Sequence, residues 1–255
     1  MKVEKVIGIG WDVGGWMGKN HGVAICQWTK DSNEISWLGE PTEVSLPPGG
    51  LLTLRDLFAA VHSPLQLEDV EGGTLVVIGV DAPLGYPKEF IRLLNGGTPS
   101  VGRPEKEIHN PLAYRTTDIE IHRVFAKKPL SAVFDRIGNN ATTAMVHARV
   151  WEQENNFKVY PFRDKAKSDN RIIVEVYPAL LKEKRFGEVR GKFRQFMPPK
   201  TEAGTDAYDA CICALFGVAF GTNGNLLPTL KGPEAHQESD AREEGWIYYI
   251  DLTSM

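Results

Sequence analysis

Five acidic residues stand where strands should end or a helix should begin, and together they suggest metal chemistry. Asp12 follows the apolar run VIGIGW, Asp81 follows LVVIGV and Glu175 follows RIIV. Asp206 and Asp209 lie in TDAYDACICALFG, where a long apolar helix should begin. Burying a carboxylate costs free energy unless a cation or donors compensate it, so carboxylates that converge on one sheet edge predict a shared divalent metal. This pattern favours metal-dependent phosphodiester chemistry.

Each acid also has a simpler interpretation. Asp12 and Asp81 are residue types that cap the loops after strands, and Asp206 is a residue type that caps the start of a helix. The D-x-x-D spacing, however, places Asp206 and Asp209 on one helical face near the positive helix N-terminus. The C-terminal ends of parallel strands meet at one edge, where ligands bind in open α/β sheets.

The elements that must position these acids alternate between strands and helices. Apolar alternation predicts three strands early in the chain, a helix at 51–62 and a fully covered strand at 74–81. A further strand follows at 171–178, a buried helix at 207–220 and a closing strand at 245–252. Residues 224–239 have the composition of a loop. The three early strands are expected at 5–12, 22–29 and 34–44.

Residues 83–170 interrupt this order and are expected to form a helical insertion within a single domain spanning residues 1–255. Helical spacing starts near Thr117, where T-D-I-E fits a capping box, and returns at 140–155. Just before this helix, Arg115 is a plausible phosphate contact because a guanidinium fork matches phosphate oxygens. Asp118 and His122, four residues apart, fit either a shared metal or proton or a solvated helix face.

Composition places few limits on the partner. The 255 residues carry a formal net charge of −4 and 42% hydrophobic residues, which is enough for a well-buried core. Residues 163–200 hold eleven Lys or Arg against five acids, a local charge of +6 that suits nucleic acid binding or simply a solvated face. Lys192 in this stretch is a predicted substrate contact. The three cysteines are expected to be buried and free.

The sequence contains little that indicates a membrane protein or a nucleotide-binding protein. No run of about 18 apolar residues occurs and the start does not have the pattern of a signal peptide, so a cytoplasmic protein without membrane contact is expected. The stretch GIGWDVGG lacks the G-x-G-x-x-G spacing of dinucleotide sites. GGWMGKN has too few residues before G-K, and Asn20 replaces Ser or Thr, for a phosphate-binding loop.

Several motifs taken together resemble the ribonuclease H superfamily. In order, these are GIGWDVG, VVIGVDAPLGYP, YRTTDIE, VEVYPA and DAYDACICAL, spread over residues 5 to 220. More closely, the set resembles a family of uncharacterised proteins described as predicted ribonuclease H-like nucleases. The resemblance implies an α/β fold with a mixed five-stranded sheet in the order 3-2-1-4-5, flanked by helices, with the insertion between strands 4 and 5.

The same resemblance implies a metal-dependent nuclease that uses two Mg²⁺ or Mn²⁺ ions and acts on nucleic acid. Asp12, Asp81 and Asp206 or Asp209 would be the metal ligands, and Glu175 an extra acid facing the same cleft. Two alternatives stay open. One is an ATP-dependent phosphotransferase of the actin-like and sugar kinase branch, with Lys19 on a nucleotide phosphate. The other is a non-catalytic nucleic-acid-binding relative.

Overall fold

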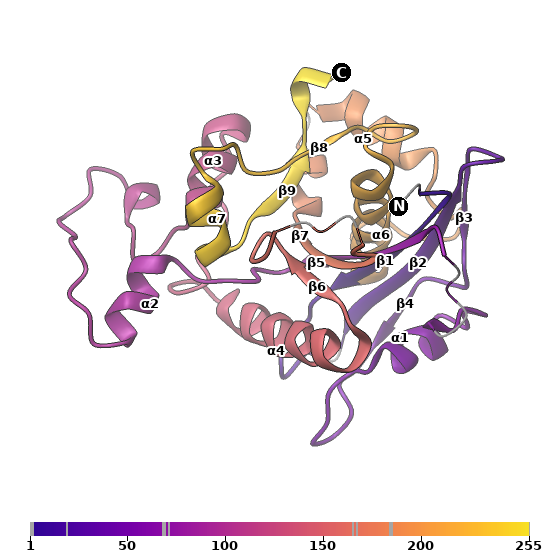
Figure 1. The fold of residues 1–255 in the computed structure, drawn as a ribbon, viewed down its shortest axis with the longest axis horizontal. Helices are drawn as coiled ribbons and strands as arrows, with labels where there is room; N and C mark the ends of the chain where they lie inside the picture. The colour runs from indigo at the N-terminus through magenta and orange to yellow at the C-terminus, as the bar shows by residue number, and fades with distance from the viewer. Residues whose placement is uncertain are drawn as a thin grey trace.

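A mixed β-sheet runs through the centre of the protein, and helices cover both of its faces (Figure 1). The computed structural model describes residues 3–18, 20–67, 70, 72–164, 166, 168–183 and 186–254. Seven strands follow one another across the sheet in the order β3-β2-β1-β5-β7-β9-β8, while β4 pairs with β2 and β6 pairs with β7. The strands are β1 (Lys5–Asp12), β2 (His21–Thr29), β3 (Glu34–Trp37), β4 (Thr42–Val44), β5 (Thr74–Asp81), β6 (Lys158–Tyr160), β7 (Arg171–Val176), β8 (Leu230–Lys231) and β9 (Ile247–Ile250).

The predicted order of the first five strands is confirmed. When the short strands β4 and β6, which lie off the main path of the sheet, are left out, the order β3-β2-β1-β5-β7 is the same as the predicted order 3-2-1-4-5. The prediction of only five strands was wrong. The segment near 245–252 becomes β9, which pairs in parallel with β7 beyond the short partner β6, and β8 then pairs with β9. The expected loop at 224–239 contains β8 and the start of α7 (Glu238–Glu244).

The strand predicted at 34–44 divides into β3 and β4, both of which pair with β2. Gly39 lies between them with φ +107°, and a Cβ there would meet the Val61 carbonyl oxygen at 2.0 Å. A side chain at this position would therefore clash, and the chain turns at the one residue that tolerates both the close contact and the positive φ.

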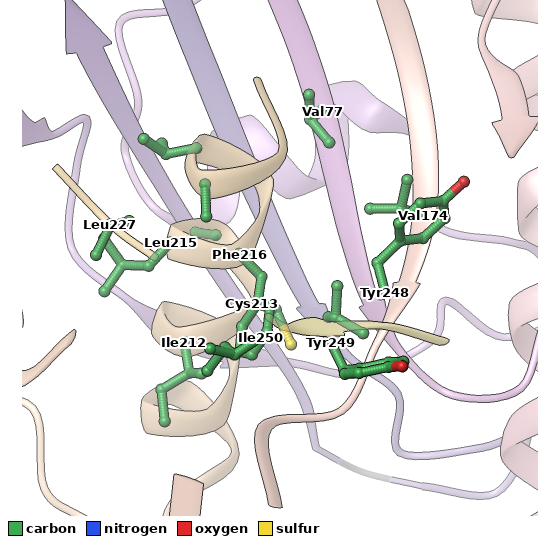
Figure 2. Packing of buried hydrophobic residues seen from close by; sticks show 14 of the residues in the cluster. Val77, Val174, Ile212, Cys213, Leu215, Phe216, Leu227, Tyr248, Tyr249 and Ile250 are labelled. Atoms are coloured by element: carbon green, nitrogen blue, oxygen red, sulfur yellow. The ribbon is translucent and has the colours of Figure 1, made fainter. Parts of the chain in front are cut away.

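Helices pack on the two faces according to the strand alternation. Val6, Val77 and Val174 point toward α6 (Asp206–Thr222) and α5 (Gly187–Arg194), whereas Ile9 and Ile78 point toward α1 (Leu54–Ala60) and α4 (Gly138–Asn155). Figure 2 shows side chains of α6 in one cluster with those of β5, β7 and β9. The predicted burial of the free cysteines is confirmed for Cys26, Cys211 and Cys213.

The segment at 83–170 contains several helices and also supplies β6. Its interpretation as an insertion within a single domain stays a prediction. Its helices are α2 (Lys88–Leu94), the 3-10 turn η2 (Glu107–His109), α3 (Thr116–Phe125) and α4. The helix predicted from Thr117 starts one residue earlier. Its first turn is closed by Asp118, which accepts a hydrogen bond from the Arg115 backbone N–H at 2.9 Å. Thr117 instead accepts a hydrogen bond from the backbone N–H of Ile247.

Among the described residues, no helix is both long enough and apolar enough to cross a membrane.

Candidate metal site at the C-terminal edge of the sheet

Asp12 and Asp81 end two neighbouring parallel strands at the same level. β1 and β5 pair in parallel from Lys5 opposite Thr74 to Asp12 opposite Asp81. Residues at one level of adjacent parallel strands point to the same face, so the two carboxylates lie side by side at the C-terminal edge. Both are partly buried.

A row of glycines brings α6 onto these strands. Helix α6 crosses β1, β2 and β5 so closely that its backbone fills the space where side chains would stand. A strand with side chains at these positions would hold the helix away, and the N-terminus of α6 could not reach the sheet edge. Added Cβ atoms would meet helix carbonyl oxygens at 2.1 Å for Gly8, 1.8 Å for Gly10, 2.0 Å for Gly22 and 2.3 Å for Gly79.

The N-terminus of α6 therefore lies beside Asp12. Gly22 is the β2 partner of Asp12, and the carbonyl oxygen that crowds Gly22 belongs to Asp206. The N-cap is Thr205, whose hydroxyl accepts the Tyr208 backbone N–H at 3.2 Å, so the interpretation of Asp206 as the N-cap was wrong. Asp206 is the first helical residue and Asp209 completes the first turn, so both residues lie at the end of the helix that meets this edge.

Three of the four acids have raised pKa values, and neighbouring carboxylates are part of the cause. Burial and the carboxylates of Asp209 and Asp206 raise the pKa of Asp12 to about 7. Burial, Asp12 and Asp209 also raise the pKa of Asp81, and burial and Asp209 raise that of Asp206. Without a cation the cluster takes up protons at a pH where isolated aspartates are ionised.

One cation already contacts the cluster, and it was not singled out from the sequence. Lys182 lies on the 3-10 turn η3 (Pro178–Lys182) after β7, and its Nζ is 2.6 Å from Asp209 Oδ2. Asp209 Oδ1 is buried and has no hydrogen-bond partner among the described residues. Although burial lowers the pKa of Lys182, the hydrogen bond to Asp209 and the surrounding carboxylates raise it on balance.

The donor atoms suit a hard divalent cation, because Mg²⁺ and Mn²⁺ prefer carboxylate oxygens. In the part of the chain that the structure describes, no three Asp, Glu, His or Cys side chains are arranged to hold one metal ion as they stand. Rotation of the carboxylates would therefore accompany metal binding. The buried, unpartnered oxygen of Asp209 is the atom that most needs such a cation.

Glu175 reaches the edge from the other face of the sheet. β7 pairs Glu175 with Val80, so its side chain points to the side opposite that of Asp81. Both of its oxygens accept hydrogen bonds from Arg115 at 2.7 Å, and one also accepts the Leu84 backbone N–H at 2.9 Å. Its predicted role as an extra acid of the site stays a prediction.

Arg115 and Asp118 form a buried ion cluster with Glu175. The Arg115 guanidinium also donates to Asp118 Oδ1 and Oδ2 at 3.0 and 3.1 Å, and only 2% of the Arg115 residue surface is exposed. The guanidinium predicted to contact phosphate is thus already held by two carboxylates. Asp118 is equally buried, so a solvated helix face was the wrong interpretation. The Nδ1 atom of His122 is buried and has no hydrogen-bond partner in the part of the chain that the structure describes.

The described part of the basic stretch at 163–200 is spread over several elements. Arg171 donates to the carbonyl oxygens of Asn155 and Leu67 and begins β7, at the end of the strand away from the acids. Lys192 lies on α5, and its contact with a substrate stays a prediction. Lys19, the predicted nucleotide contact, lies outside the described residues, as do Lys165, Lys167, Lys184 and Arg185.

Two hollows border the acids. A pocket of about 60 Å³ lies beside Asp81, with the Arg115 cluster on one side and Leu130, Ile137 and Tyr177 on another. Burial, followed by the nearby carboxylates of Asp81 and Asp118, raises the pKa of Tyr177 to about 12. A wider groove of about 730 Å³ passes Thr205 and Ala207 and is lined by Glu40, Glu43, Glu202 and Lys200.

Residues 10–183 match the protein family described as "Protein of unknown function (DUF429)". The match includes Asp12, Asp81 and Lys182 and ends before α6. No curated protein matches the chain. No solved structure matches it either.

Proposed function

The chain belongs to the DUF429 family, whose description assigns no activity, and on the basis of the acidic edge we propose that it is a metal-dependent nuclease that hydrolyses phosphodiester bonds in nucleic acid. One observation carries the proposal: Asp12 and Asp81 are paired at the ends of adjacent parallel strands, and the start of α6 adds Asp206 and Asp209 at the same edge. Neighbouring carboxylates, that of Asp209 among them, raise the pKa of Asp12, Asp81 and Asp206, and a divalent cation would relieve this repulsion.

We also propose that the fold is ribonuclease H-like. Support comes from the strand order β3-β2-β1-β5-β7, with β2 antiparallel to β1 and both β5 and β7 parallel to it. The acids occupy the positions that the resemblance implies: the first strand, the fourth strand in sheet order and the last long helix.

In the proposed reaction the carboxylates of Asp12, Asp81 and Asp206 would hold the cation. When bound, Mg²⁺ or Mn²⁺ would neutralise charge on the phosphoryl oxygens and lower the pKa of a water molecule. The water oxygen forms a bond to phosphorus while the bond from phosphorus to the leaving oxygen breaks. The water proton passes to a carboxylate or to solvent, and the leaving oxygen takes up a proton from solvent. The products are a phosphate monoester and an alcohol.

Calorimetric titration of Mg²⁺ and Mn²⁺ provides the test, followed by cleavage assays on single-stranded, duplex and junction substrates of DNA and RNA. The double variant Asp12→Asn, Asp81→Asn should lose both metal binding and cleavage. Asp31→Asn, which changes an exposed aspartate in the turn between β2 and β3, is the matched control and should retain both. Cleavage by the double variant at the parent rate would refute the site.

The alternatives give different results in the same assays. A phosphotransferase would bind ATP with Mg²⁺ and would not cleave nucleic acid. A non-catalytic relative would bind nucleic acid without metal and without turnover. The described residues give no observation that favours either alternative over the nuclease.

A further inference from the structure

We infer that Lys182 takes the place of a second metal ion, so that the acidic edge binds one divalent cation and Lys182 supplies the other positive charge. This inference rests on the proposed function, because it concerns the same carboxylates. It departs from the two-ion mechanism that the resemblance implies.

The contact between Lys182 and Asp209 is the first support. Nζ lies 2.6 Å from Asp209 Oδ2, and the Asp209 side chain is 15% exposed. The backbone of Lys182 is anchored, because Leu180 and Leu181 of the same 3-10 turn are buried in the core. The fold therefore positions the Lys182 ammonium group at the acidic edge, where it offsets the negative charge of the carboxylates.

The distribution of charge is the second support. Among the described residues, no ion pair joins a Lys, Arg or His to Asp12, Asp81 or Asp206, whereas Lys182 pairs with Asp209 at the same edge of the sheet. Two ions in one carboxylate site require ligands that both ions share. Asp209 is poorly placed to be shared, because an ammonium group already holds one of its oxygens.

Lys182 is also placed to meet the substrate. An ammonium group has three N–H donors, and the hydrogen bond to Asp209 uses one of them. The Lys182 side chain is 50% exposed, so the remaining donors can reach an incoming phosphate oxygen. Lys182 is thus a positioning residue that fixes Asp209 and draws the scissile phosphate toward the single ion.

Calorimetry with Mn²⁺ alone tests this inference on the full-length protein. The parent should bind one ion. Lys182→Met should bind a second ion, or bind the first at least fivefold more tightly, because the competing cation is gone. Lys182→Arg keeps the charge and should bind one ion like the parent. Lys128→Met is the matched control, because Lys128 pairs with a single exposed carboxylate, that of Glu107, at 2.7 Å.

Electron paramagnetic resonance of the same samples gives an independent result. Two neighbouring Mn²⁺ ions couple magnetically, so Lys182→Met with two ions should show a coupled signal that the parent lacks. Two coupled ions in the parent would overturn the inference while leaving the nuclease proposal intact. An unchanged number and affinity of ions in Lys182→Met would overturn it as well. Absence of Mn²⁺ binding by the parent would instead reject the proposed metal site itself.

Discussion

Gly10 of β1 lies directly against the backbone of Ala210 in α6, so closely that a Cβ on Gly10 would be 1.8 Å from the Ala210 carbonyl oxygen. Gly10 precedes Asp12 by two residues and Ala210 follows Asp209 by one. The contact therefore sets the distance between the strand that carries one acid and the helix that carries two others.

Gly10→Ala should damage both stability and the site. The methyl group must push α6 away from β1, and overpacking of this kind costs roughly 1 to 3 kcal/mol or more. Urea unfolding should show the lower free energy of unfolding, and Mn²⁺ calorimetry should show at least tenfold weaker binding by the protein that remains folded. Gly102→Ala is the control, because nothing lies within 4 Å of a Cβ at that position. Parent-like metal binding by Gly10→Ala would mean that the helix does not position the ligands.

The pKa of Asp12 predicts how stability depends on pH. Its carboxyl group has a pKa of about 7 in the folded protein and 3.8 ordinarily. Between these values the folded state holds more protons than the unfolded state, so the free energy of unfolding should fall as pH rises from about 4 to 7. At about 1.4 kcal/mol per unit of pKa the full effect is on the order of 4 kcal/mol, and partial exposure of the carboxylate reduces it.

Thermal or urea unfolding across this pH range, in the presence of a chelator, checks the prediction. Asp12→Asn should be more stable than the parent at pH 8 and show a flatter profile. Added Mg²⁺ should stabilise the parent mainly at high pH, because the cation binds the ionised carboxylates. A parent profile that rises from pH 4 to 7 would contradict the shifted pKa.

Glu175 should matter for folding more than for metal binding. Glu175→Gln leaves Arg115 with fewer charged partners in a buried cluster, and breaking a buried ion pair costs roughly 3 to 5 kcal/mol. Urea unfolding should show this loss, while the folded variant binds Mn²⁺ within about threefold of the parent. Asp81→Asn should do the reverse, with little loss of stability and loss of the ion. Loss of the ion in Glu175→Gln would instead make Glu175 a ligand.

The sequence reveals the acids but not all of their surroundings. Asp12, Asp81, Asp206 and Asp209 are recognisable because each follows a strand or starts a helix, and strand ends converge in parallel sheets. The side to which Glu175 points depends on the pairing of Val80 with Glu175, a register that no local pattern specifies.

Lys182 is hidden for a related reason. It is one of eleven basic residues between 163 and 200, and its contact with Asp209 spans 27 residues and depends on the turn after Pro178. Arg171, in the same stretch, lies at the start of β7, where its guanidinium group donates to two backbone carbonyl oxygens. Charge counts along a sequence cannot distinguish these two environments, because strand β7 places Arg171 at one edge of the sheet and Lys182 at the opposite edge.

Trp16 provides the last prediction, which concerns the substrate. It follows Asp12 in the loop after β1, and the residue is 37% exposed. Its indole N–H donates to Thr142 of α4 at 3.0 Å, so the ring is held against the helix that starts near the pocket beside Asp81. An anchored, exposed indole near the proposed metal site is suited to stacking on an unpaired base, which is worth roughly 1 to 3 kcal/mol.

Trp16→Ala should weaken binding of a fluorescent single-stranded oligonucleotide by about 5- to 100-fold, and Trp16→Phe by less. Leu94→Ala, which removes an exposed apolar side chain from α2, should bind like the parent. Equal affinity for Trp16→Ala and the parent would rule out stacking at this position and direct the search for the nucleic acid contact to α5 and Lys192.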